Sequence, residues 1–349
     1  MRRLPPRWVR RLVLGPLVVL LAVLLVPTTA MLALLVLGIV SWALPGRLRL
    51  TRVLWMASFY VLWDAAALVA LFALWVASGF GWAIHRPAFQ RAHYALARRM
   101  ITAFFWQVRW TLRLTIDVEG AEALAPLAGR PVVVVSRHAG PGDSFVLVDA
   151  LLNRFAREPR IVLKDSMQWD PAIDVLLNRI PTRFITPHSR RRPGAPGGSA
   201  AVGDLAVGMD DDDALLIFPE GGNVTPRRQA RRVQALRDAG DDRLAAYAES
   251  MRHVMAPHLG GVLAALDAAP EAEIVFVAHT GLESLVTARD IWRALPMDKR
   301  IVMAGRTVPR AQVPTPARER EEWLFAQWLS VDEWIDAYER REREAGAVP

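Results

Sequence analysis

Cysteine is absent from the 349 residues of this chain. Its absence excludes disulfides, thiolate metal sites and a cysteine nucleophile. Lysine is almost absent too, occurring only at Lys164 and Lys299, so the formal net charge of +8 is carried by arginine. A positive chain favours anionic partners such as lipid headgroups or nucleic acid. Outside the apolar N-terminal part, no basic stripe with interleaved aromatic residues and no zinc-ligand spacing occurs, so nucleic acid is not expected as a partner.

Apolar residues are in excess, and the excess is concentrated before residue 85. A helix needs about 20 apolar residues to cross a bilayer, and two runs, at about 12–44 and 53–82, are longer than that. We expect residues 1–85 to form a transmembrane anchor of two helices. Pro27 lies in the middle of the first run, so one kinked span and a short hairpin are both open. A signal peptide is disfavoured because this run is too long and lacks a small-residue cleavage site.

Arginines flank the two runs, before the first and after the second. The positive-inside rule therefore places both outer ends in the cytoplasm. The short loop between the runs also carries arginine, a mild conflict that two re-entrant hairpins would remove. Asp64 lies inside the second run; a partner helix or a shallow depth explains it better than a functional role. Residues 86–112 predict an amphipathic helix that lies on the membrane surface or covers the sheet.

The stretch Pro131–Asp143 carries the first candidate for chemistry. Val132–Val135 reads as a short buried strand, and His138 follows directly after its end. Two glycines and a proline at 139–142 force a tight loop, and Asp143 then begins a helix. The loop can bring the carboxylate to the imidazole, leaving the other ring nitrogen to accept a proton from a hydroxyl. On spacing alone, a loop histidine beside a helix-capping aspartate is the simpler interpretation.

A second strand and loop, Ala214–Asn223, has the same design. Its apolar strand ends at a proline followed by Glu220, Gly221 and Gly222, a composition that allows backbone to approach a ligand closely. Two loops that follow parallel strands lie at the same edge of the sheet, where open α/β sheets bind ligands. The four acids just before this strand, Asp210–Asp213, favour a solvated turn over a metal site.

Together, these stretches resemble the 1-acylglycerol-3-phosphate acyltransferase (lysophosphatidic acid acyltransferase) family of glycerolipid acyltransferases. The first motif of that family is His, four residues, Asp, as in His138 to Asp143. The third is Phe-Pro-Glu-Gly-Thr-Arg, where this chain has Phe218 to Asn223. The resemblance covers about 113–308 and implies an α/β fold, a mixed and mostly parallel sheet flanked by helices. We expect a catalytic domain at 113–310 and a charged C-terminal helix within 311–349.

The resemblance also implies the reaction and its residues. His138 would be the general base on an acceptor hydroxyl, and Asp143 would orient it. The acyl donor would be acyl-CoA or acyl carrier protein as co-substrate, with no cofactor and no metal. The acceptor would be lysophosphatidic acid, giving phosphatidic acid at the cytoplasmic (inner) membrane, with the catalytic domain facing the cytoplasm and membrane lipids as partners. The residues expected to bind substrate are Glu220, Gly221, Gly222, Asn223, Lys164, Arg183, Arg227 and Arg228.

Several departures from the family pattern leave the acceptor open. Asn223 stands where the family has Arg, and the second motif is degraded around Arg183. The alternatives are another lysophospholipid or a glycolipid as acceptor, or a membrane protein that keeps the fold without catalysis. A hydrolase would want a nucleophile, and Ser136 and Ser144 are near His138 without a Gly-x-Ser-x-Gly elbow. A helix is expected from Asp242 to Met255. His279 ends a further strand and is expected to be a satisfied strand-end histidine.

Overall fold

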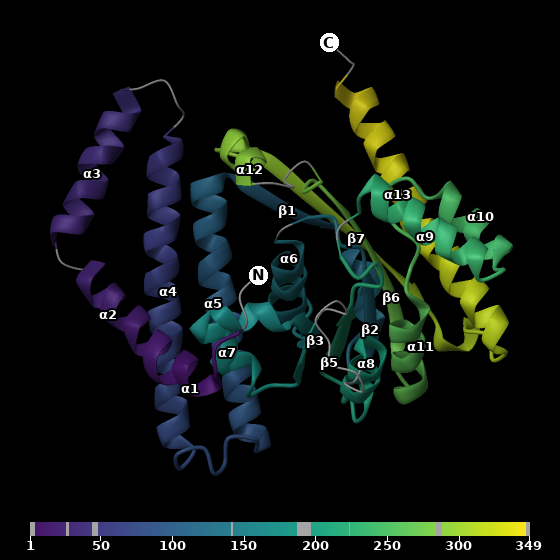
Figure 1. Ribbon diagram of the computed structural model, residues 1–349, viewed down its shortest axis with the longest axis horizontal. Coiled ribbons are helices and arrows are strands. Elements are labelled where there is room, and N and C mark those ends of the chain that lie inside the picture. The colour runs from purple at the N-terminus through teal and green to yellow at the C-terminus, as the bar shows by residue number, and fades with distance from the viewer. Residues whose placement is uncertain are drawn as a thin grey trace.

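The computed structural model describes residues 4–25, 28–43, 48–140, 142–186, 197–222, 224–283 and 288–346. A seven-stranded sheet with the order β1-β7-β6-β2-β5-β3-β4 forms its centre (Figure 1). Its strands β6 and β7 pair antiparallel and the other neighbours pair parallel. The predicted mixed, mostly parallel sheet is confirmed. The strands are β1 (Leu114–Glu119), β2 (Val132–Ser136), β3 (Glu158–Lys164), β4 (Thr182–Ile185), β5 (Asp213–Ile217), β6 (Glu273–Thr280) and β7 (Lys299–Val308).

Strand β2 lies between β5 and β6, with every residue buried. Successive side chains of a strand point to opposite faces. Val133 and Val135 accordingly enter one hydrophobic core, and Val132 and Val134 the other. An uninterrupted β-branched run is what a parallel strand covered on both faces requires. Strand β2 ends at Ser136, so the chain leaves the sheet just before His138.

Two layers of helices supply these cores. One face is covered by α5 (Pro87–Leu112), α6 (Asp143–Asp149), the π-helical turn η3 (Ala150–Arg154) and α12 (Ala288–Ala294). The other is covered by α8 (Gly198–Ala206), α9 (Pro226–Asp238), α10 (Asp242–Ser250), α11 (Leu259–Ala268) and α13 (Ala317–Gly346). The expected charged C-terminal helix is α13, which buries Phe325 and Trp328 fully.

The N-terminal helices lie outside α5 (Figure 1). They are α1 (Arg7–Val9), the π-helical turn η1 (Arg10–Leu14), α2 (Gly15–Leu25), α3 (Thr28–Ala43) and α4 (Arg49–Ala77). In the ribbon α2 and α3 run the same way with a bend between them, and α4 returns beside both. Helices α2 and α3 therefore do not pack against each other as a hairpin. Two helices, Arg7–Leu25 and Arg49–Ala77, have the length and apolar composition to cross a membrane.

Helix α4 is hydrogen-bonded to the rest of the protein along its length. Near its start, the Arg49 side chain donates to the Leu295 carbonyl (3.0 Å). In its middle, the buried Asp64 carboxylate accepts from the Ala172 backbone N–H (3.1 Å), at the first turn of α7 (Pro171–Leu177). Asp64 thus faces a partner helix, as expected. Further contacts run from Trp63 to the Met100 carbonyl and from Arg179 to the Leu71 carbonyl.

A buried ion pair fixes the start of the N-terminal helices. The Arg10 guanidinium donates to the Asp174 carboxylate (2.7 Å) and to the Gln168 side chain (2.9 Å). Asp174 lies on α7 with a fully buried side chain, and Arg10 is only 7% exposed. The first apolar helix is therefore attached to the α/β domain through charge as well as through packing.

Two sequence expectations differ from the structure on this side of the sheet. The helix predicted from Asp242 to Met255 ends at Ser250, because the next backbone N–H groups donate to a side chain of α13 instead of to helical carbonyls. The acids before β5 are not all solvated, since Asp213 is buried and pairs with Arg160 (2.5 Å). Within the described ranges, no three acids or histidines gather as a metal site.

Candidate active site

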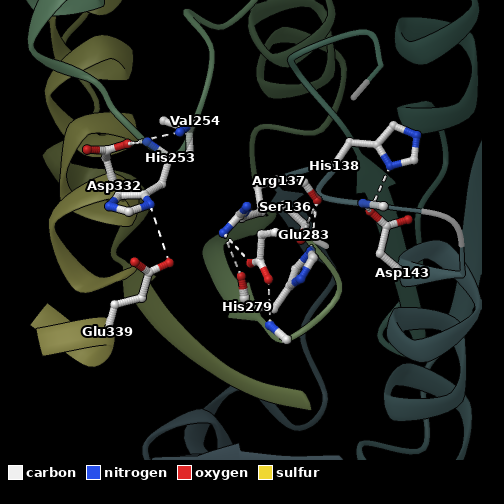
Figure 2. Close-up of polar contacts among 12 residues, drawn as sticks. Ser136, Arg137, His138, Asp143, His253, Val254, His279, Glu283, Asp332 and Glu339 are labelled. Atoms are coloured by element: carbon white, nitrogen blue, oxygen red, sulfur yellow. Dashed lines mark hydrogen bonds and ion pairs between the residues drawn. The ribbon is translucent and has the colours of Figure 1, made fainter. Parts of the chain in front are cut away.

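His138 and Asp143 meet at the carboxyl edge of β2. The distance from His138 Nδ1 to Asp143 Oδ2 is 2.7 Å, and a carboxylate acceptor requires the proton to be on Nδ1. The far edge of the ring, which carries Nε2, points away from Asp143 (Figure 2). The His138 side chain is 22% exposed and that of Asp143 1%. The predicted pairing is thus present, with the aspartate beneath and the imidazole at the surface.

The tight loop between the two residues depends on a close approach at Gly140. Its N–H donates to Asp143 Oδ2 (3.2 Å). A Cβ on Gly140 would lie 2.9 Å from the Leu282 carbonyl oxygen, closer than the two atoms can pack. Glycine at this position lets the loop rest on the segment after β6 and leaves the carboxylate turned towards His138.

The charge state of Asp143 is set by opposing effects. Burial raises the pKa of the carboxyl, but the hydrogen bond from His138 and its charge outweigh burial, with help from His279 and the Gly140 N–H. The pKa of Asp143 therefore lies below its usual value. An ionised aspartate stabilises the imidazolium that forms when His138 takes a proton.

Glu220 is fully buried and both of its oxygens are occupied by backbone groups. Oε2 accepts the His138 N–H (2.6 Å), and Oε1 accepts the Met255 N–H (2.9 Å). Burial raises the pKa of Glu220 to about 7, although these two N–H groups act in the opposite direction. The carboxylate thus joins the loop after β5 to the loop after β2.

Gly221 and Gly222 have φ angles of 65° and 144°, values that side chains with a Cβ rarely adopt. Two cation-forming side chains lie against them. A Cβ on Gly221 would be 3.4 Å from the His258 ring, and one on Gly222 would be 2.8 Å from Arg228 Nη1. Burial lowers the pKa of His258, and the charges of Arg232 and Arg228 lower it further. The backbone of Gly222, which has no side chain, thus lies next to the Arg228 guanidinium.

Charged and polar side chains from β6 and the residues after it lie beside His138, to its left in Figure 2. Arg137 is 2% exposed; it donates to the His279 carbonyl (2.9 Å) and pairs with Glu283 (3.1 Å). His279 Nε2 lies 3.0 Å from the Arg137 carbonyl. Burial lowers the pKa of His279 to about 4, with the Arg137 charge adding to the effect. His279 is a satisfied strand-end histidine, as expected.

The other predicted binding residues are scattered. Lys164 ends β3 at the same edge as His138, but β5 lies between β3 and β2, a separation of about 10 Å. Arg183 lies in the first half of the edge strand β4, opposite Val162, and is exposed. Arg227 is exposed on the first turn of α9. Asn223 falls outside the described residues.

The two serines near His138 are not placed as nucleophiles. Ser136 is fully buried within β2, and its hydroxyl lies 3.4 Å from the Val277 carbonyl oxygen. The Ser144 hydroxyl donates to Asp143 Oδ1 (3.3 Å), on the carboxylate and not on the imidazole. This geometry argues against the hydrolase alternative.

The α/β domain matches a known protein family. Residues 115–287 match the sequence model of the family described as Acyltransferase, and the chain belongs to this acyltransferase family. The match includes His138, Asp143 and Glu220. No curated protein matches the chain significantly. A similar solved structure is the crystal structure of the 1-acyl-sn-glycerophosphate (LPA) acyltransferase PlsC from Thermotoga maritima, at 12% identity and a TM-score of 0.46, covering 78% of this chain and 96% of that one.

Sequence reasoning missed Arg137 and Met255. Arg137 directly follows an apolar buried strand, a position at which an arginine needs a buried acidic partner; that signal was present. Met255 contributes only its backbone N–H to Glu220, a contribution that leaves no mark on residue type.

Proposed function

We propose that this acyltransferase moves a fatty acyl group from acyl-CoA or acyl carrier protein to the hydroxyl of lysophosphatidic acid, making phosphatidic acid. The observation that carries the proposal is the His138–Asp143 pair, with a buried ionised carboxylate on Nδ1 and the opposite edge of the ring pointing away from it. A base so arranged can take a proton from a hydroxyl.

The reaction needs no protein nucleophile. The acceptor oxygen attacks the thioester carbonyl carbon while His138 Nε2 takes the hydroxyl proton. The tetrahedral intermediate collapses, the C–S bond breaks, and the imidazolium returns the proton to the departing sulfur. Asp143 keeps the imidazole in one tautomer and stabilises its charged form. Both protons and electrons balance without a cofactor.

The acceptor would be bound beside the loop at Gly221 and Gly222. Arg228 lies over this loop, and Arg227 precedes it on the same turn of α9. Guanidinium groups bind phosphate through paired hydrogen bonds. Glu220 contributes indirectly, because both of its oxygens hold backbone N–H groups. Lys164 lies at the same edge, farther from His138. Asn223 stays a prediction from the sequence.

A second acceptor class, another lysophospholipid or a glycolipid, is favoured by one observation. Arg183 is one candidate in the degraded second motif for binding the acceptor phosphate, and it lies three strands from β2 and away from the carboxyl edge. An acceptor whose headgroup is larger, or carries no free phosphate, would not need it.

The two apolar N-terminal helices suggest association with a membrane. We propose the inner membrane, with the α/β domain on the cytoplasmic side, because acceptor and product both dissolve in the bilayer and the flanking arginines follow the positive-inside rule.

Purified protein in detergent, given radiolabelled acyl-CoA and a panel of lyso-acceptors, tests the proposal. We expect transfer to lysophosphatidic acid that falls by about 10²- to 10⁴-fold in His138→Ala. His85→Ala, at an exposed histidine, is the matched control. Transfer only to another lysolipid would support the second class. No transfer to any acceptor, with acyl carrier protein tried as donor, would overturn both and favour a non-catalytic protein.

A further inference from the structure

The segment 251–258 links α10 to α11 without helix or strand. Three successive backbone N–H groups, those of Arg252, His253 and Val254, donate to the Asp332 carboxylate of α13, at 3.0, 2.5 and 2.9 Å (Figure 2). Asp332 is 4% exposed. The Asp332 side chain thus accepts hydrogen bonds from the backbone of three residues that lie about 80 positions away in the sequence.

The path continues from this segment to the candidate base. Trp328, one turn before Asp332 on α13, donates its indole N–H to the Met255 carbonyl (3.0 Å). The Met255 N–H donates to Glu220 Oε1, and Glu220 Oε2 accepts the His138 N–H. Helix α13 is therefore joined to the His138 backbone by hydrogen bonds and one short stretch of chain.

The hydrogen bonds at Val254, Met255 and Trp328 are buried, whereas Arg252 is exposed and His253 is half-buried. Val254, Met255, Glu220 and Trp328 are at most 2% exposed. A buried N–H that loses its acceptor finds no water to replace it. The segment can therefore hold its shape only while Asp332 accepts its N–H groups, and Glu220 can hold His138 only while Met255 stays in place.

We propose that Asp332 and Trp328 are positioning residues for the transfer reaction. They fix residues 252–255, which fix Glu220, which fixes the backbone from which the His138 ring projects. The claim that this serves catalysis rests on the proposed function, whereas the mechanical link from α13 to His138 does not. A base displaced by about 1 Å from a hydroxyl loses on the order of 10²-fold in rate.

Amide hydrogen exchange measures the link without reference to activity. Oδ1 of Asp332 accepts all three N–H groups, and Oδ2 accepts only that of Arg252. Asp332→Asn removes the negative charge from this acceptor and, with the amide oxygen in place of Oδ1, turns an NH₂ group towards the Arg252 N–H. We expect exchange about 10-fold faster or more at residues 252–254, and also at Met255 and His138. Glu333→Gln removes a charge from an exposed position of the same helix and should change none of these. Leu324→Ala weakens the packing of α13 but removes none of these hydrogen bonds. It therefore serves as the control that shows how much faster exchange becomes from lost stability alone.

The kinetic part uses the same variants. In Asp332→Asn we expect kcat about 10- to 100-fold lower, with KM within about 2-fold of wild type, and a larger loss than in Leu324→Ala. Trp328→Phe keeps an aromatic ring and removes the N–H donor; it should act in the same direction, and it carries the test if Asp332→Asn does not fold.

Two outcomes would overturn the proposal. One is faster exchange at 252–254 with no change at His138; the other is a loss of kcat no greater than in Leu324→Ala. If wild-type protein transfers no acyl group while exchange at His138 still responds to Asp332→Asn, the proposed function fails and the link from α13 stands as structural.

Discussion

Asp143 and His138 differ sharply in exposure although they form one pair. The aspartate touches no substrate in the proposed reaction, so its effect must pass through the imidazole. Asp143 also makes a local hydrogen bond, because its Oδ1 accepts the backbone N–H of Ser144 at the start of α6 (2.6 Å). Asp143 is not the N-cap of α6, because Gly142 holds that position and no side chain caps the helix. Its contact with His138 is the one that the proposed reaction uses.

For Asp143→Asn we expect kcat to fall by about 10²- to 10⁴-fold with little change in KM, because the amide no longer stabilises the imidazolium. The measurement is steady-state transfer at saturating acceptor. Asp204→Asn, on the exposed side of α8, is the control. A loss confined to KM would mean that Asp143 binds substrate instead.

His279 is expected to make the free energy of unfolding depend on pH. Its pKa in the folded protein is about 4, against an ordinary value of 6.5. At a pH between these two values, His279 is protonated in the unfolded chain but neutral in the folded protein. The free energy of unfolding should therefore fall as the pH is lowered from about 6.5, by up to about 1.4 kcal/mol per pH unit.

Denaturant unfolding of wild type and His279→Gln at several pH values checks this. Glutamine keeps an N–H donor for the Arg137 carbonyl but does not titrate, so the variant should lose less stability towards acid. Glu220 titrates nearby with the opposite sign, because its raised pKa favours the protonated folded state. Subtracting the two curves removes that contribution. Parallel curves would rule out His279 as the source.

At the scale of elements, local sequence was sufficient for the sheet and insufficient for the loops between helices. The run Val132–Val135 became β2, and the run before Phe218 became β5, because β-branched and aliphatic residues buried on both faces leave few other structures. The end of α10 was mispredicted, since its signal lies on α13 at Asp332. A hydrogen bond across about 80 residues has no local pattern.

The same limit applies to the candidate site. His138 and Asp143 are close in sequence, and their loop could be predicted from two glycines and a proline. The position of Arg183 could not, because it depends on β4 being the edge strand. Nor could the contact of Arg228 with Gly222, which depends on how α9 leaves the loop after β5.

The buried pair between Arg10 and Asp174 predicts a cost for separating two elements. Arg10→Ala leaves a fully buried carboxylate with a hydrogen bond from the Asn178 side chain (3.1 Å) and a longer ion pair with Arg11 (3.5 Å). We expect a loss of about 3 kcal/mol, measured as the unfolding midpoint in detergent. Arg7→Ala, at an exposed position, should have little effect. Adding Asp174→Asn to Arg10→Ala should recover part of the loss; if it does not, the buried charge was not its cause.

Across the whole molecule, the N-terminal helices form a further layer beyond α5 (Figure 1). Their outer surface is apolar, with Leu20, Leu24, Leu32 and Leu35 each more than half exposed. Soluble proteins rarely expose an apolar surface this large, and such a surface is typical of contact with a membrane or a protein. The sequence predicted the apolar composition, but not that α4 would be bound along its length to the α/β domain.

We therefore expect the protein to stay in the membrane fraction when cells are washed with high salt or alkaline carbonate, and to require detergent for release. Charge alone would give a salt-sensitive association, since headgroup attraction is screened within about 10 Å at moderate ionic strength. The measurement is the distribution between pellet and supernatant. Release by salt alone would assign the association to arginines and not to α2 and α3.

The place of α13 in the chain has a consequence for synthesis. Every strand of the sheet, the loop with His138 and the glutamate beneath it leave the ribosome before Asp332 does. If Asp332 completes the support of that loop, a nascent chain carries all the reacting groups of the enzyme without their final arrangement. The site then becomes competent only after the last helix has been made, so unfinished chains at the membrane surface would consume little acyl donor.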